Sequence, residues 1–301
     1  MSKTEPQDKR NRLMTFALCS GLVATTFSTA ILISELPAQA KKAKKTDKAA
    51  TTTTKVDTDK AAQDAVSEGA KLIMFKNPKQ ALTKFNEALR LKPNFANAYA
   101  NRANAYMILG NTGEAIADAN KAISLNPNLA IAYVNRSWAY NKTRQYKKAV
   151  EDTSKAISLK PDLVMAYTNR SHAYNKLENH KAALEDCNKI LSLNPKFTVA
   201  YINRAHTYIG LGNYKEAIAD CDKAIELNPH LSKAYLNRGH ANRELGNLDQ
   251  ALRDFEKALA LNDKLAAAYY NRSRVYEAKA SKDLKQATKL GFVAASDDND
   301  N

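Results

Sequence analysis

The chain has 301 residues, and its 46 Lys and Arg side chains exceed its 31 Asp and Glu side chains, which gives a net charge of +15. Residues 61–296 hold 35 basic and 22 acidic side chains, so the excess belongs to the body of the chain, where it favours acidic partners or simply a well-solvated surface. Three cysteines exclude a disulfide framework, and the absence of H-E-x-x-H, C-x-x-C, G-x-S-x-G and Gly-rich phosphate motifs predicts a protein that is not an enzyme and uses no metal or cofactor.

The first forty residues have the pattern of a targeting segment. Basic side chains precede an apolar run at 13–33, and Ala38-Gln39-Ala40 follows that run. A basic region, an apolar region and an A-x-A site are typical of a signal peptide, with cleavage expected after Ala40. The run is also long enough to span a bilayer as an uncleaved anchor. We therefore expect residues 1–40 to be a signal peptide or signal anchor, and the protein to be periplasmic, secreted or membrane-anchored by residues 13–33.

The next segment, residues 41–60, consists mainly of Lys, Ala, Thr and Asp. A segment without large apolar residues cannot bury enough surface to offset the entropy that ordering it costs. The composition therefore predicts a disordered tether. A minority alternative is that its lysines contact an anionic membrane surface.

A pattern of 34 residues then recurs. The string A-Y-x-N-R begins six times at this spacing, and a second apolar pattern follows it, as in E-A-I-A-D-x-x-K-A-I-x-L-N-P at 114–127 and 216–229. Both patterns place apolar residues at i, i+3, i+4 and i+7, the period of an α-helix. A break such as Leu109-Gly110-Asn111 ends the first helix, and a Pro ends the second. Each unit is predicted to be a helix–turn–helix, and the strings begin at Ala98, Ala132, Ala166, Ala200, Ala234 and Ala268.

The units resemble the tetratricopeptide repeat, whose unit is also 34 residues long. In the unit 130–163, the family's positions are occupied by Tyr133, Ser137, Tyr140, Ala149, Ala156 and Pro161. The resemblance implies an all-α fold: a right-handed superhelical solenoid that binds a protein or peptide in a concave groove and has no small-molecule substrate. Within the domain 61–291 we expect six full units and one truncated unit, at 62–95, 96–129, 130–163, 164–197, 198–231, 232–265 and 266–291.

The terminal units depart from the pattern, as terminal repeats commonly do. The first lacks the Tyr and the Asn-Arg pair and has Glu68 instead. The last lacks about five residues, because Asp283 comes five positions early relative to Asp254. Its segment 282–290 is predicted to be a short capping helix that ends at Gly291. Residues 292–301 are predicted to be an acidic, disordered tail.

The Arg of each string has an Asp sixteen residues later in its own unit, and the first unit has Glu68 and Lys84 at the same spacing with the signs reversed. This pattern predicts an ion pair between the two helices of one repeat. The five Arg–Asp pairs are Arg102/Asp118, Arg136/Asp152, Arg170/Asp186, Arg204/Asp220 and Arg238/Asp254. These arginines are therefore predicted to be structural, so that the basic side chains of the groove are Lys142, Lys176, Lys233, Arg243 and Arg274.

Two further sets of residues recur every 34 positions. Cys187 and Cys221 occupy one interior position of successive second helices, which are too far apart for a disulfide, so we expect core residues. The spacing of His172, His206 and His240 prevents one metal ion from bridging them. These histidines are predicted to line the concave groove. Trp138 occupies the same position of its repeat and is predicted to be an aromatic contact.

An asparagine recurs in each first helix, although Asn is a mediocre helix former. One interpretation is local structure, such as a hydrogen bond to a neighbouring turn. The other is a ladder of amides that clamps the backbone of an extended peptide, because each amide offers a donor and an acceptor. Such a ladder is similar to the one in the repeats of O-GlcNAc transferase, whose catalytic domain is absent here. The six residues are Asn101, Asn135, Asn169, Asn203, Asn237 and Asn271.

The sequence thus predicts an interaction scaffold that binds an extended, acidic peptide segment. Two alternatives stay open: a structural assembly subunit that uses the convex face or the solenoid ends, and a basic helical-repeat protein that binds nucleic acid. A membrane is expected as a partner only through the N-terminal segment.

Overall fold

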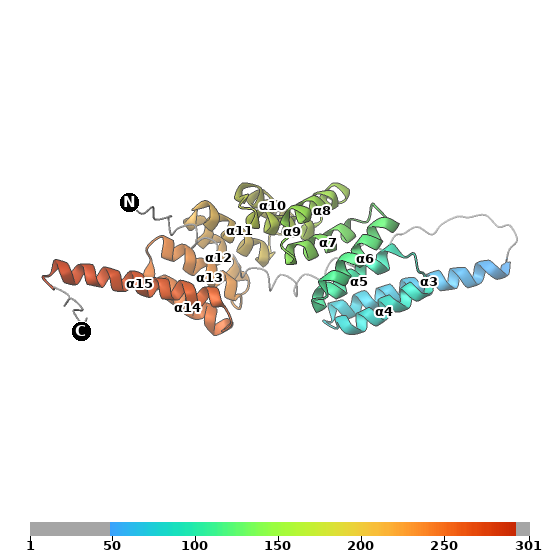
Figure 1. The fold of residues 1–301 in the computed structure, drawn as a ribbon, viewed down its shortest axis with the longest axis horizontal. Coiled ribbons are helices and arrows are strands. Elements are labelled where there is room, and N and C mark those ends of the chain that lie inside the picture. Colours follow the sequence, from blue (N-terminus) through green and yellow to red (C-terminus); the bar gives the residue numbers. More distant parts are fainter. Residues whose placement is uncertain (1–48, 293–301) are drawn as a thin grey trace, which may run out of the picture. The chain divides into compact units, whose positions relative to one another are not determined.

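The computed structural model describes residues 49–292, which form helices and no strand. These residues belong to two compact units, one ending at Leu193 and the other beginning at Asn194. All of these helices but the last are paired, with a short turn inside each pair (Figure 1). The first unit contains α3 (Ala49–Met74), α4 (Pro78–Leu91), α5 (Ala96–Leu109), α6 (Thr112–Leu125), α7 (Ala130–Lys142), α8 (Tyr146–Leu159), α9 (Val164–Lys176) and α10 (His180–Leu193). The second contains α11 (Thr198–Leu211), α12 (Tyr214–Leu227), α13 (Ser232–Glu244), α14 (Leu248–Leu261) and α15 (Ala266–Lys289).

Within each unit, the helix pairs stack in chain order. Each first helix contacts its own second helix, and that second helix contacts the first helix of the next repeat. Consecutive first helices also contact one another, as in α5 with α7, α7 with α9 and α11 with α13. A stack of pairs whose first helices approach each other most closely curves toward those helices. The predicted repeat solenoid is therefore confirmed in both units, with the first helices on the inner side.

Small side chains make this close packing feasible. The Ala that opens each A-Y-x-N-R string is completely buried in all six repeats. The Tyr that follows fixes the junction between repeats, because the Tyr133 hydroxyl donates to the Pro127 carbonyl (3.1 Å) and the Tyr167 hydroxyl to the Pro161 carbonyl (3.0 Å). The recurrence of this Tyr thus reflects a contact between successive repeats, which Tyr201 also makes with the Pro195 carbonyl (3.0 Å).

The turn inside each repeat requires a left-handed residue at one position. Gly110, Gly212 and Gly246 occupy it with φ of 85°, 78° and 79°. The other three full repeats place a non-glycine residue there, namely Lys76 (φ 57°), Arg144 (φ 60°) and Glu178 (φ 59°). The helix break therefore does not depend on glycine, although glycine adopts this conformation at lower cost.

The structure corrects the predicted tether, because residues 49–60 belong to α3. The composition argument considered this segment alone, whereas here it continues a helix that packs against α4. Adding residues to a helix that is already nucleated costs less than starting one. Asp59 also pairs with Lys92 just after α4, at 3.0 Å.

The structure also corrects the predicted capping helix at 282–290. Residues 266–289 form one continuous helix, α15, because the missing residues are those of the turn and what remains carries no Gly or Pro. Its end does coincide with the expected residue, Gly291, which has a φ of 92°. The predicted targeting segment (1–40), residues 41–48 and residues 293–301 of the predicted tail lie outside the described residues.

Candidate binding face of the first helices

The predicted ion pairs within repeats are confirmed. In each of the five full repeats with an A-Y-x-N-R string, the Arg guanidinium binds its Asp through two nitrogens, with shortest distances of 2.7–2.8 Å. The first repeat has the reversed pair, Lys84 to Glu68, at 2.8 Å. The aspartates are nearly buried, so each carboxylate is compensated where it is shielded from water. Hydrogen bonding to Asp118 raises the pKa of Arg102.

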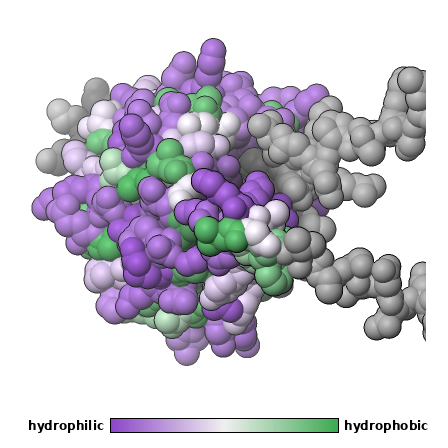
Figure 2. Space-filling view, turned by 90° about the vertical axis from the view of Figure 1, so that its left-hand side faces the viewer, coloured by the Kyte–Doolittle hydropathy of each residue, from purple (hydrophilic) through white to green (hydrophobic). Residues whose placement is uncertain are grey.

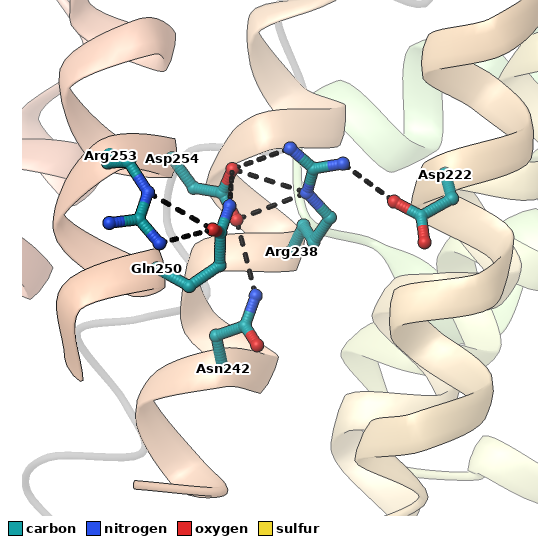
Figure 3. Close-up of polar contacts among 6 residues, drawn as sticks. All are labelled: Asp222, Arg238, Asn242, Gln250, Arg253 and Asp254. Atoms are coloured by element: carbon teal, nitrogen blue, oxygen red, sulfur yellow. Dashed lines mark hydrogen bonds and ion pairs between the residues drawn. The ribbon is translucent and has the colours of Figure 1, made fainter. Parts of the chain in front are cut away.

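Four of the five guanidinium groups also bridge to the preceding repeat. Arg102 donates to Asn86 (2.7 Å), Arg136 to Asn120 (2.7 Å) and Arg170 to Ser154 (3.2 Å). Figure 3 shows the most acidic case, in which Arg238 lies between Asp254 of its own repeat and Asp222 of the preceding one. These arginines stabilise the stack and are not free basic surface, as the sequence predicted.

The asparagine column is part of the same packing. Asn135 and Asn237 are buried, and their amides donate to carbonyls of the preceding first helix, namely Ala100 (2.8 Å) and Ile202 (3.2 Å). Asn169 donates to the Val134 carbonyl (3.2 Å) and the Ser137 hydroxyl (3.0 Å). Asn101 and Asn271, also buried, donate within their own helices.

Most of these amides therefore do not face solvent as a free ladder, and the local-structure interpretation accounts for them. Asn203 differs because it is half-buried and its side chain makes no hydrogen bond within the described part of its own unit, residues 194–292. Contact of this column with a peptide stays a prediction.

The aromatic side chains of the predicted groove are half-buried. Trp138 lies on α7 beside the cluster formed by Met107, Ala115 and Ala139. His172, the next residue of that column, meets the ring of Tyr146 edge-on, with a centroid distance of 6.4 Å. Packing against apolar neighbours fixes the orientation of these rings while one edge stays accessible.

The predicted basic residues differ in exposure. Lys142 on α7 is exposed, whereas Lys176 on α9 and Lys233 on α13 are half-buried. Arg274 on α15 is exposed and pairs with Glu277 of its own helix. On the first unit, Trp138, His172, Lys142 and Lys176 therefore lie on two adjacent first helices.

A charged cluster on α13 includes two more of the predicted residues. Glu244 contacts Arg243 and lies 3.4 Å from His240 Nε2. Hydrogen bonding to His240, together with Arg243, lowers the pKa of Glu244 to about 2. Arg243 also donates to Asn271 of α15, at 2.5 Å. Arg243 is thus compensated by a carboxylate, which reduces the positive charge expected there. His206, on α11, is half-buried.

Sequence reasoning missed one buried pair of asparagines, Asn141 and Asn175. Both are buried, and the Asn141 amide donates to the Asn169 carbonyl of the next first helix (2.9 Å). The Asn175 side chain meets His180 Nδ1 at 3.0 Å. The signal for them was available, because A-Y-N-K occurs at 139–142 and again 34 residues later.

The remaining candidates behave as core residues. Cys187 and Cys221 are completely buried and form no disulfide, and burial raises the pKa of the Cys221 thiol well above its ordinary value. Among residues 49–292, no cluster of His, Cys, Asp and Glu has the arrangement of a metal site. Nor does this part of the chain contain a helix that is both long and apolar enough to span a bilayer.

The class defined by these features is a helical repeat protein with two-helix units. The family described as tetratricopeptide repeat matches residues 96–129, 130–163, 166–197, 198–231 and 232–265, and the description TPR repeat matches 79–110. These matches cover more than half of the chain, which therefore belongs to the tetratricopeptide-repeat family.

Solved structures share the fold. YrrB, described as a TPR protein with an unusual peptide-binding site, is 24% identical with a TM-score of 0.50, and the match covers 63% of this chain and 97% of YrrB. Pseudomonas aeruginosa pilF is 17% identical with a TM-score of 0.62, covering 72% and 99%. PilW, a type IV pilus biogenesis factor, is 19% identical with a TM-score of 0.62, covering 69% and 97%. No curated protein sequence matches this chain.

Proposed function

We propose that this protein is a non-enzymatic scaffold that binds an extended, acidic segment of a partner protein on the first helices of residues 96–176. The repeat fold supports a role in protein–protein interaction. The observation that carries the finer proposal is the placement of Trp138 and His172 beside Lys142 and Lys176 on α7 and α9. A half-buried aromatic ring flanked by basic side chains suits an acidic peptide with an apolar anchor.

Affinity in this proposal comes from the ring and the lysines rather than from a full asparagine ladder. One amide hydrogen of Asn135 and at least one of Asn169 are already committed to neighbouring atoms. The positive charge of the chain adds attraction at long range, which raises the rate of encounter with an acidic partner and falls with salt. The face seen in Figure 2 is hydrophilic over most of its area, with scattered hydrophobic side chains.

A peptide array tests the proposal. Peptides that vary in net charge and aromatic content are probed with the full chain, with Trp138→Ala and with Lys142→Glu. We expect acidic peptides to bind best and each variant to weaken that binding roughly tenfold, a change of about 1.4 kcal/mol. Lys155→Glu is the matched control, because Lys155 is exposed on the second helix α8. An equal loss of peptide binding in Lys155→Glu contradicts the assigned face. Tighter binding of the full chain to a nucleic acid than to the best peptide supports the nucleic-acid alternative.

A further inference from the structure

The last repeat has a first helix but no second helix packed on it. Its A-Y-x-N-R string lies in α15, yet the turn residues are missing, so α15 continues straight to Lys289. Figure 1 shows α15 extending well past the amino-terminal end of α14. An ion pair between Lys279 and Asp249 (2.6 Å) connects the middle of α15 to the start of α14.

The face of α15 that should receive a second helix is uncovered. Tyr269 and Tyr276 are 48% and 52% exposed, whereas Tyr235, the counterpart of Tyr269 in the preceding repeat, is 8% exposed. Ser273 is also exposed, although its counterpart Ser137 is completely buried. These three positions are those that a second helix covers in a complete repeat.

The continuation of α15 keeps the residue pattern of a second helix. In the complete repeat before it, the buried residues of α14 are Ala251, Asp254, Phe255, Ala258 and Leu259, and Leu261 is half-buried. The same spacing in α15 gives Ala280, Asp283, Leu284, Ala287 and Thr288, with Leu290 at the position of Leu261. In α14 the first four of these residues are at most 2% exposed, whereas Leu284 and Leu290 are 54% and 77% exposed. This second-helix remnant, residues 280–290, thus presents an interior face with nothing packed on it.

The two halves of α15 cannot pack on each other within one chain. Arg272 corresponds to Arg238 and Asp283 to Asp254, which pair at 2.7 Å in the complete repeat. Eleven residues of straight helix separate Arg272 from Asp283, a rise of about 16 Å. Arg272 accordingly forms no ion pair with a described residue, and its guanidinium lies over the ring of Tyr269.

We propose that a second copy of this chain covers this face, with the two α15 helices antiparallel. The helices of a complete repeat are antiparallel as well, so the remnant of each copy then occupies the place of the missing second helix in the other. Arg272 lies opposite the partner's Asp283 and Ser273 near the partner's Leu284, which puts the two-fold axis between Glu277 and Ala278. The contact is isologous and closes as a dimer.

A second copy fits better than another segment of the chain. The exposed first half of α15 carries the residues that a second helix covers, and its exposed second half carries the residue pattern of a second helix. An antiparallel pair of α15 helices therefore covers both halves at once. The sequence after the helix, V-A-A-S-D-D-N-D-N at 293–301, does not carry the second-helix pattern. The proposal is independent of the peptide site, because no residue of α15 belongs to that face.

Charge reversal tests the pairing. Arg272→Asp and Asp283→Arg are made separately in the full chain, and the molar mass of each is measured by sedimentation over a range of concentrations. The unaltered chain is expected to dimerise. Each variant alone is expected to dissociate about 100-fold more readily, because like charges then meet at two equivalent positions. An equimolar mixture of the two variants is expected to recover the dimer, because both cross-chain pairs become Asp with Arg.

The mixture distinguishes this arrangement from other forms of association. Lys285→Glu is the matched control, since Lys285 is exposed and lies outside the repeated interior pattern, and it should dimerise like the unaltered chain. Circular dichroism of both variants checks that the repeats stay folded. A monomeric unaltered chain overturns the proposal. So does a mixture of Arg272→Asp and Asp283→Arg that associates no better than each variant alone.

Discussion

Gly239 on α13 lies directly against the ring of Phe255 on α14. A Cβ atom on Gly239 would be 2.7 Å from Phe255 Cε1 and 3.1 Å from Asp254 Cβ. The first repeat has the same arrangement, with Gly69 against Phe85. In other repeats a residue smaller than Phe occupies the second-helix position, and the residue facing it is larger than Gly. Thr153 faces Ser137, and Cys187 faces Ser171. The two helices of each repeat are therefore matched in volume.

Gly239→Ala is accordingly expected to destabilise the protein. Overpacking a filled core costs about 1–3 kcal/mol, which exceeds the gain of roughly 1 kcal/mol from replacing glycine within a helix. Urea unfolding measures the change. Gly113→Ala is the control, because Gly113 lies near the start of α6 with no atom within 4 Å of the added Cβ, and it should be neutral or stabilising. Equal effects of the two substitutions would contradict the volume argument.

Arg144→Gly is expected to stabilise the protein by about 0.5–1 kcal/mol. Arg144 has a φ of 60°, and an L-residue in this conformation is strained by contact of its Cβ with the backbone, whereas glycine is not. The gain is partly offset by the greater entropy of glycine in the unfolded chain. Urea unfolding of Arg144→Gly and of the reverse change, Gly212→Arg, should give shifts of opposite sign. A loss of stability in Arg144→Gly would show that the Arg side chain makes a contact that outweighs the strain.

The sequence predicted the repeats well because each recurring residue makes a local contact. The string's Ala is buried, its Tyr binds a carbonyl near the end of the preceding repeat, and its Arg pairs with an Asp sixteen residues later. These contacts lie within one repeat or between neighbours, so a fixed spacing reveals them. The role of Asn was harder to predict, because periodicity shows that a residue recurs but not whether its side chain faces a neighbour or a ligand.

Predictions at the chain's ends were less accurate for a related reason. Composition treated residues 49–60 as independent of the rest, although they extend a helix that is stabilised elsewhere. The length of the last repeat showed that its turn is missing, but not that its two segments form one continuous helix. A gap in a repeat pattern does not indicate whether the segments on either side form two helices or one. Helix continuity through residues 277–283 resolved this point.

Acid is expected to remove a contribution to stability that depends on Glu244. The pKa of Glu244 is about 2 in the folded protein against an ordinary value of 4.5, so the folded state favours the ionised carboxylate. A lowered folded pKa gives a contribution that is fully present above about pH 5 and is lost as the pH falls toward 2. The free-energy difference between the unaltered chain and Glu244→Gln should therefore shrink as the pH falls below about 5. A difference that does not change down to pH 3 would contradict the assigned contacts with His240 and Arg243.

The last prediction concerns the asparagines and separates their structural role from a role in binding. Asn135 is 2% exposed and donates to the Ala100 carbonyl at 2.8 Å, so Asn135→Ala removes a buried hydrogen bond between first helices. A loss of about 1–2 kcal/mol is expected. Asn203→Ala is the matched comparison from the same column, because its side chain is half-buried and makes no hydrogen bond within residues 194–292 of its own unit. Urea unfolding should therefore show a lower midpoint for Asn135→Ala and little change for Asn203→Ala.

Binding to the best peptide of the array, measured on both folded variants, completes the comparison. If Asn135→Ala leaves stability unchanged but weakens peptide binding, its amide acts on the ligand and the structural assignment is wrong.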